Sequence, residues 1–206
     1  MHQTRQQAST RLPIERKGTK YVARASSDLE NSVPVVIAMR DILKLAKTKK
    51  EVKKMINQKM LKINGREVSD HNDSIKLFNI FEAGKTYVLK LSTTRKFFLE
   101  ETKDSKERLC KVIGKKILPG NKVQINLHDG TNVFGDKKIK TGDSVYLDLS
   151  NKIKSHVSPE KGKEVFAISG RYEGQYGKIS DANDNKLLIK FKESSSTLDL
   201  KNLIVL

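Results

Sequence analysis

Apolar residues recur every three or four positions between residues 35 and 46, a spacing that predicts a helix with one buried face. They are Val35, Ala38, Met39, Ile42, Leu45 and Ala46. A second helix is predicted to begin at Thr48, because Thr48 and Glu51 fit a capping box, in which each side chain satisfies a free backbone N–H. At about 100° per residue, one side of this helix is apolar, with Val52, Met55 and Ile56. The other side carries Lys49, Lys50, Lys53 and Lys54.

After the second helix the pattern changes to strands. Asn64 and Gly65 form the dipeptide typical of a two-residue turn, which predicts a hairpin between residues 61–63 and 66–68. Residues 75–80 and 86–91 also read as strands, because apolar and polar positions alternate, most clearly in the second. The helices and hairpin together predict a small module that buries its apolar faces and leaves a row of lysines outside.

The remainder of the chain is predicted to be β-structure in two further parts. Apolar residues alternate in residues 123–127 and 145–149, and a turn is predicted at 128–130. From residue 161, short apolar runs at 165–168, 186–191 and 197–206 surround a glycine-rich stretch, as in a barrel of about five short strands. The polar stretch 92–106 suggests a boundary. We therefore expect an α+β, multidomain chain divided into residues 1–33, 34–92, 93–160 and 161–206.

The charge of the chain favours an anionic partner. Its 206 residues include 41 Lys and Arg against 24 Asp and Glu, a formal net charge of +17. The excess is concentrated at the start, where the first 68 residues hold 16 basic and 6 acidic side chains. Such a balance is typical of proteins that bind nucleic acid or an anionic membrane. Because no apolar run approaches the ~20 residues that span a bilayer, we prefer nucleic acid.

Candidate chemistry is sparse. The single Cys110 excludes an internal disulfide and suits a reducing compartment, and its apolar neighbours predict a core residue. With four scattered His residues, we expect neither a metal site nor another cofactor. His128 and Asp129 lie at a predicted hairpin tip, where neighbouring side chains diverge, so a turn-stabilising role for Asp129 is favoured over catalysis. Asp41 is expected to pair with Arg40 or a nearby Lys, or to favour the positive N-terminal end of its helix.

The first 33 residues lack a sustained apolar period. Alone, they are expected to form a solvated basic arm that becomes ordered on an RNA surface. A flexible solubilising tail is the alternative. The lysine side of the second helix likewise has two interpretations, a phosphate-binding face or an ordinary solvated surface.

Several stretches resemble one protein family. Residues 40–43 (RDIL), 46–52 (AKTKKEV) and 61–66 (LKINGR) resemble the S-four-type RNA-binding module. Residues 11–17 (RLPIERK), 20–24 (KYVAR), 109–112 (LCKV), 141–145 (TGDSV) and 160–163 (EKGK) resemble the archaeal and eukaryotic family of small-subunit ribosomal protein four. The most specific likeness is residues 120–132 (GNKVQINLHDGTN), and residues 170–179 (GRYEGQYGKI) are similar to a KOW motif. Residues 26–32 (SSDLENS) stand where that family usually has a Pro-Gly-Pro-His element.

The resemblance implies a non-catalytic constituent of the small ribosomal subunit, cytoplasmic and of archaeal type. It implies an S-four-type module, a β-rich central domain and an SH3-like barrel. The partners implied are small-subunit rRNA and neighbouring small-subunit proteins, without a membrane or a homo-oligomer. Residues 171–178 face either RNA or protein. The RNA-binding residues expected are Arg5, Arg11, Arg16, Lys17, Lys20, Arg40, Lys44, Lys47, Lys49, Lys50, Lys53, Lys54, Lys59, Arg66, Arg171, Tyr172, Gln175 and Lys178.

Two other functions remain open from the sequence. An RNA-modifying enzyme could dock through the same module, although residues 92–206 offer no acid–base constellation. A transcription or ribosome-assembly factor could carry the KOW barrel. High-salt washing of small subunits separates these possibilities, because an integral protein stays bound and a factor is released.

Overall fold

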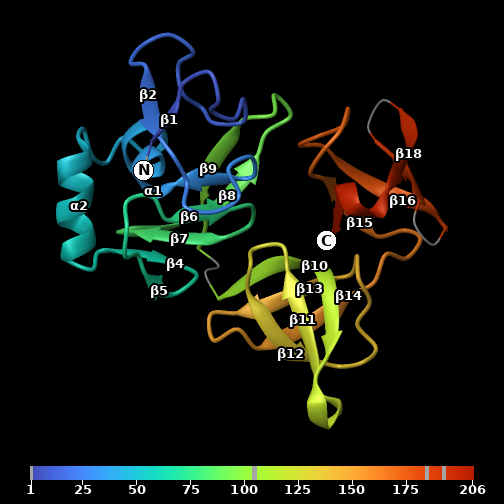
Figure 1. Ribbon diagram of the computed structural model, residues 1–206. Helices are drawn as coiled ribbons and strands as arrows, with labels where there is room; N and C mark the ends of the chain where they lie inside the picture. The colour runs from blue at the N-terminus through green and yellow to red at the C-terminus, as the bar shows by residue number, and fades with distance from the viewer. Residues whose placement is uncertain (1, 104–105, 184–185, 192–193) are drawn as a thin grey trace. The chain divides into compact units, whose positions relative to one another are not determined.

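The computed structural model describes residues 2–103, 106–183, 186–191 and 194–206 (Figure 1). The chain is mostly β-structure with short helices, and it divides into two compact units, Met1–Ser105 and Lys106–Leu206. In the part of the chain that is described, neighbouring strands pair in antiparallel fashion throughout. The coarse expectation of an α+β chain with more than one core is confirmed.

The first unit is built on a five-stranded sheet in the order β5-β4-β7-β8-β9. Its strands are β4 Leu61–Ile63, β5 Arg66–Glu67, β7 Ile80–Ala83, β8 Lys85–Leu91 and β9 Phe97–Glu101. Two short strand pairs accompany it, β1 His2–Thr4 with β2 Tyr21–Ala23, and β3 Ser32–Pro34 with β6 Ser74–Lys76. The stretch expected as one strand, residues 75–80, is two strands, because Phe78 has a positive φ of 61° and breaks the extended run. The polar stretch after residue 92 contains β9, which extends the first sheet.

The second predicted helix is confirmed as α2 Lys49–Asn57. Thr48 accepts the N–H of Glu51 at 3.3 Å and donates its hydroxyl to the Glu51 carboxylate at 3.0 Å. The other carboxylate oxygen accepts the backbone N–H of Lys47 at 2.8 Å, so the cap satisfies two backbone donors. Val52 and Ile56 are buried beneath the helix, as expected from their spacing.

The first predicted helix is shorter than its apolar spacing indicates. It begins as α1 Val35–Ile37 and continues as one wider π-type turn, η1 Ala38–Ile42, in which the N–H of Leu43 bonds to the carbonyl of Ala38 at 2.9 Å. Lys44 then takes a φ of 56° and ends the helix. Leu45 lies beyond this end of the helix and is 50% exposed, so its assignment to the apolar face is wrong.

The N-terminal segment packs into the first unit, which contradicts the expectation of a solvated arm. Leu12 is 1% exposed, and Ala8, Val22 and Ala25 are buried as well. The N–H of Phe97 donates to the carbonyl of Arg11 at 2.9 Å, which ties the segment to the start of β9. These contacts join residues distant in sequence, so a periodicity argument over the first 33 residues does not detect them.

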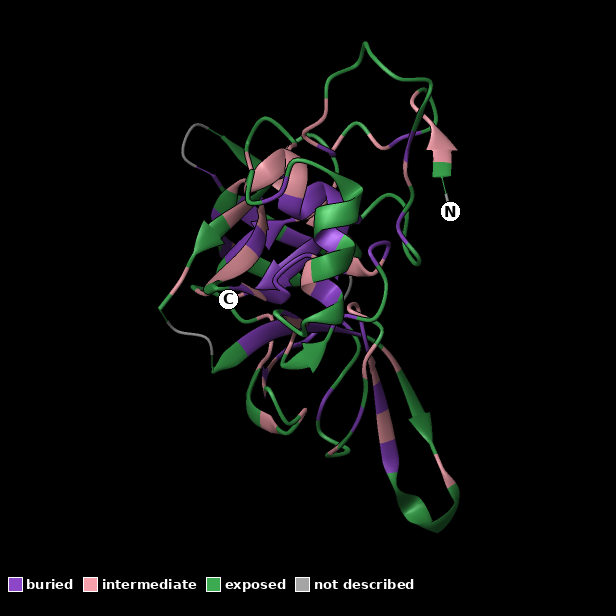
Figure 2. Ribbon diagram, turned by 90° about the vertical axis from the view of Figure 1, so that its left-hand side faces the viewer, coloured by how far each residue is buried: buried purple, intermediate pink, exposed green. Residues whose placement is uncertain are grey.

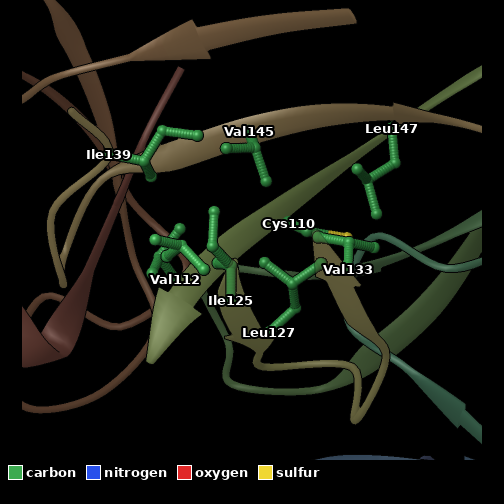
Figure 3. Close-up of a cluster of buried hydrophobic side chains, with 9 residues drawn as sticks. Cys110, Val112, Ile125, Leu127, Val133, Ile139, Val145 and Leu147 are labelled. Atoms are coloured by element: carbon green, nitrogen blue, oxygen red, sulfur yellow. The ribbon is translucent and has the colours of Figure 1, made fainter. Parts of the chain in front are cut away.

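The second unit begins with a five-stranded sheet in the order β12-β11-β10-β13-β14. Its strands are β10 Glu107–Ile117, β11 Val123–Leu127, β12 Asn132–Gly135, β13 Ser144–Asp148 and β14 Ile153–Val157. A short 3₁₀ turn, η2 Pro119–Asn121, joins β10 to β11. Figure 3 shows the apolar side chains of this sheet pointing toward one another around Cys110, Ile125 and Val145. The alternation read in residues 123–127 is thus confirmed as one buried face.

The second unit ends in another five-stranded sheet, in the order β18-β17-β16-β15-β19. Its strands are β15 Glu164–Ala167, β16 Tyr176–Asn183, β17 Lys186–Lys190, β18 Ser195–Asp199 and β19 Leu203–Val205, with a 3₁₀ turn η3 Leu200–Asn202 before the last strand. The expected number of short strands is met, with β16 beginning inside the glycine-rich stretch at Tyr176. Residues 197–206, expected as one strand, instead divide into β18, η3 and β19, so that expectation is wrong. The core of this sheet includes Val165, Ile179, Ile189 and Val205.

Specific bonds join the two sheets of the second unit. Lys111 on β10 is buried and donates its ammonium to the carbonyls of Leu200 and Lys201, both at 2.7 Å. The hydroxyl of Ser144 accepts the N–H of Val205 at 3.1 Å. Gly142 lies against Leu200 with a φ of 96°, and a Cβ there would collide with the leucine side chain.

Candidate nucleic-acid interface

The most regular group of cations lies on the outer side of α2. Lys49, Lys50, Lys53 and Lys54 are all exposed, opposite buried Val52 and Ile56. Figure 2, in which α2 faces the viewer, shows the helix largely exposed along this surface. Among the described residues, none of the four pairs with a carboxylate. We call these four residues the lysine face; its charge is left available to an anion.

The only acidic side chain of α2 does not neutralise the lysine face. Glu51 accepts backbone N–H groups at the start of the helix, and these hydrogen bonds hold the pKa of its carboxyl below the usual range. Its negative charge favours the positive N-terminal end of the helix dipole. Glu51 is therefore part of the cap that orients the lysine face.

The segment before α2 adds further cations. Arg40 forms two hydrogen bonds with Asp41, at 3.1 and 2.8 Å, so the expected pairing of Asp41 with Arg40 is confirmed. This ion pair raises the pKa of Arg40. Lys44 and Lys47 are exposed on the connection to α2.

The hairpin after α2 has the predicted turn. Asn64 and Gly65 have φ values of 51° and 79°, as a type I′ turn requires, and Ile63 pairs with Arg66 across it. Asn64 also accepts the N–H of Ile80 through its side chain at 2.9 Å, which holds the hairpin against β7. Arg66 is exposed, and Lys59 pairs with Glu67 at 3.1 Å.

The N-terminal basic residues fall into two groups. Arg5 is turned into its own segment, donating to the carbonyl of Thr19 at 2.7 Å, to the hydroxyl of Thr19 at 3.0 Å and to the carbonyl of Glu15. Arg11 bonds to Asn31. The other three predicted residues of this segment are exposed: Arg16, Lys17 and Lys20.

The glycine-rich loop of the second unit holds the last predicted residues. Tyr172 stacks on Phe191 with ring centroids 4.3 Å apart and planes within 3° of parallel, so its ring packs against the core of this sheet. Arg171 and Lys178 are exposed, and Gln175 is half-buried. The N–H of Gln175 bonds to the carbonyl of Tyr172 at 3.1 Å, within the loop.

Two clefts in the first unit bring several predicted cations together. One of about 620 Å³ is lined by Arg5, Arg40, Lys44 and Lys47. A second, of about 180 Å³, is lined by Arg5, Arg40 and Lys49 together with residues that the sequence did not indicate, chiefly Tyr21, His71 and Asn72. The only sequence signal for the latter pair is the polar run at residues 69–74, which is typical of any loop.

The groups considered for catalysis have structural partners. Asp129 accepts the N–H and hydroxyl of Thr131, at 2.8 and 2.9 Å, and forms a buried ion pair with Arg108 at 3.2 Å. His128 accepts the N–H of Lys111 through Nδ1 at 3.1 Å. Burial raises the pKa of the Cys110 thiol to about 12. Asp129 is thus the expected turn-stabilising residue, and Cys110 is the expected core residue.

None of the helices formed by the described residues has the length and apolar character needed to cross a membrane. Within the same ranges, no three His, Cys, Asp or Glu side chains gather in a way that could hold a metal ion.

Comparison with known proteins agrees with this architecture. Residues 83–153 match the family described as "Ribosomal family S4e", and residues 161–191 match the KOW motif. The crystal structure of the 30S ribosomal protein S4e from Thermoplasma acidophilum is similar, with a TM-score of 0.73 and 24% identity over 86% of this chain and 95% of that chain.

Two curated relatives match most of the chain. Both are named small ribosomal subunit protein eS4. The protein from Methanocella arvoryzae is 30% identical over 187 residues, covering 87% of this chain and 80% of its own. The protein from Archaeoglobus fulgidus is 30% identical over 185 residues, covering 87% and 79%. From this identity and coverage, the chain belongs to the S4e family of ribosomal proteins.

Proposed function

We propose that this protein is a structural constituent of the small ribosomal subunit, acts in translation in the cytoplasm, and binds small-subunit rRNA. The observation that carries the RNA contact is the lysine face, four exposed cations on one side of a capped helix. Ammonium groups at that spacing suit successive phosphates of an RNA backbone, which supply most of the affinity in such complexes. Membership of the S4e family supports the ribosomal role.

The finer assignments are also proposals. Residues 34–92, which include the helices and the hairpin, serve as the S-four-type RNA-binding module, and residues 161–206 serve as a KOW barrel of the SH3-like type. The exposed Arg16, Lys17, Lys44 and Lys47 extend the RNA surface beside the lysine face. On the barrel loop, Arg171 and Lys178 face rRNA or a neighbouring small-subunit protein. Arg5 and Tyr172 contribute chiefly to folding, since their polar or aromatic groups are used within the protein.

The test of the lysine face is the salt dependence of binding. Replacing Lys50, Lys53 and Lys54 with Gln keeps helix propensity and the aliphatic stems while it removes three charges. If each contacts one phosphate, the slope of log affinity against log salt for small-subunit rRNA should flatten by about 2 to 3 units. The free energy of unfolding should change by less than about 0.5 kcal/mol, as is usual for surface substitutions.

The matched control removes the same charge elsewhere. Lys116, Lys122 and Lys137 are exposed in the second unit, and their replacement with Gln should leave the slope nearly unchanged. Equal slopes for the two triple variants would mean that charge acts without regard to position, and the lysine face would then be an ordinary solvated surface. Release of the wild-type protein from small subunits by high-salt washing would contradict the structural role.

A further inference from the structure

The smaller cleft of the first unit has an unusual combination of polar groups. Three cations line it, Arg5, Arg40 and Lys49, and no Asp or Glu is among the residues that line it. His71 and Asn72 line it too, each 7% exposed. We call this site the His71 cleft.

His71 leaves a buried hydrogen-bond acceptor without a partner. Its Nδ1 lies 2.7 Å from a carboxylate oxygen of Asp70, and because a carboxylate accepts, Nδ1 carries the proton. Burial, with the charges of Lys49 and Lys53, lowers the pKa of His71 against the opposing effect of Asp70, which favours the neutral ring at pH 7. The lone pair of Nε2 is then an acceptor, and within the described residues it has no hydrogen-bond partner.

Asn72 provides a second such acceptor. Its side-chain oxygen Oδ1 is buried and likewise has no partner among the described residues. A buried acceptor without a donor destabilises the folded chain, so two of them in one cleft favour a ligand that donates to both. The missing complement is a molecule that presents N–H or O–H donors.

The loop that carries these acceptors is held firmly. Asp73 accepts the N–H groups of Ser69 and Asp70, at 2.9 and 3.0 Å. Asp70 accepts the N–H of Asn72 at 2.7 Å, and the carbonyl of His71 accepts the N–H of Val36 at 3.0 Å. The acceptors are therefore fixed in place before any ligand arrives, as a binding site requires.

A ligand that satisfies this cleft needs a negative charge and hydrogen-bond donors together. We propose that the His71 cleft takes up one unpaired nucleotide of an RNA strand. The phosphate lies against Lys49, the one of the three cations without an internal partner among the described residues, since Arg5 donates within its own segment and Arg40 pairs with Asp41. A base amino group or the ribose 2′-hydroxyl donates to His71 and Asn72. Tyr21 already contacts the ring of His2, with centroids 4.7 Å apart, and the ammonium of Lys20, 5.4 Å from the ring centroid. The ring is still 50% exposed at the cleft, and that surface offers a place for stacking, as is common where proteins read splayed-out bases.

Position and size favour RNA as the source of this nucleotide. Lys49 belongs both to the cleft and to the lysine face, so a backbone that follows α2 passes the mouth of the cleft. At about 180 Å³ the cleft is below the ~300–1,000 Å³ of sites that enclose whole small molecules, and it fits part of a longer chain. This inference rests on the proposed rRNA-binding function.

The first experiment follows His71 directly. The ¹⁵N resonance of His71 Nε2 in the full chain reports on donation to its lone pair. A single-stranded adenosine hexanucleotide should shift this resonance, whereas inorganic phosphate and a blunt-ended RNA duplex should not. An unmoved resonance at a saturating hexanucleotide concentration overturns the proposal. Tighter binding of free AMP than of the hexanucleotide overturns the assignment to an RNA strand.

The second experiment uses three variants and the same hexanucleotide. His71→Phe keeps a flat ring but removes the acceptor, and should weaken binding about tenfold, the factor expected for one hydrogen bond. Lys49→Gln removes a cation of the cleft and should also weaken binding of the hexanucleotide. This variant keeps the proposal testable if His71→Phe does not fold. Lys122→Gln removes an exposed charge of the second unit and should bind as the wild type does.

The outcomes separate this inference from the proposed function. If wild-type protein does not bind small-subunit rRNA, the proposed function fails. If it binds rRNA while His71→Phe and Lys49→Gln bind the hexanucleotide as tightly as Lys122→Gln does, the proposed function stands and the His71 cleft is wrong.

Discussion

Lys111 shows how one residue of this basic chain can serve folding instead of binding. Its ammonium is buried and bonded to the carbonyls of Leu200 and Lys201, so it joins the two sheets of the second unit. Burial lowers the pKa of Lys111 to about 8. Nothing in the sequence distinguishes it from its exposed neighbours, because the carbonyls it meets lie about ninety positions away.

Lys111 should make stability depend on pH. In the unfolded chain its pKa is about 10.4, so between pH 8 and 10.4 the unfolded state binds more protons, and stability rises with pH. The unfolding free energy of the wild type minus that of Lys111→Met should therefore increase across this window, by up to about 3 kcal/mol. Calorimetric unfolding at several pH values measures it.

The comparison with Lys111→Met cancels the other groups that titrate in the same range. Cys110, with its pKa raised to about 12, acts in the opposite direction, since the unfolded thiol loses its proton first. Both proteins share this effect. A difference that stays flat from pH 8 to 10.4 would show that Lys111 keeps its proton in the folded state.

At the scale of elements, the sequence predicts most accurately those elements that depend on interactions between residues close together in the chain. The cap at Thr48, the helix α2 and the Asn64–Gly65 turn each depend on residues within four positions, and all three are confirmed. The first helix was less well predicted, because its π-type turn departs from the 100° spacing. The His71 cleft was missed, because it assembles from five separate stretches of the first unit.

The N-terminal segment yields an element-scale prediction that reverses the one made from sequence. Because Leu12 is 1% exposed, Leu12→Ala should lower the free energy of unfolding by about 2–5 kcal/mol. Leu29→Ala is the matched control, since Leu29 is 36% exposed and should cost much less. Denaturant titration measures both. If both variants lose equally little unfolding free energy, the segment does not pack into the fold and is the solvated arm expected from the sequence.

At the scale of the whole molecule, the chain consists of two units with separate cores. Met1–Ser105 contains the lysine face and the His71 cleft, and Lys106–Leu206 contains the two further sheets with their own apolar clusters. Among the described residues, each sheet is formed by strands of one unit. Each unit therefore has the contacts that an independently folding domain requires.

We expect the two units to fold as separate fragments. A chain of residues 106–206 should show dispersed amide resonances and cooperative unfolding, since its two sheets retain the bonds of Lys111 and Ser144. In a chain of residues 1–105, replacing Lys50, Lys53 and Lys54 with Gln should still flatten the slope of log affinity for rRNA against log salt. A fragment 106–206 that lacks dispersed resonances would show that its sheets depend on the first unit.

The buried thiol in the first sheet of the second unit has a practical consequence. Cys110 is 0% exposed, it is the only cysteine, and its raised pKa leaves almost no thiolate near neutral pH. An alkylating reagent can react only after β10 has separated from its neighbours. The rate of Cys110 alkylation therefore reports how often this sheet opens. Mass spectrometry can measure that rate even when the protein is one component of an intact ribosome.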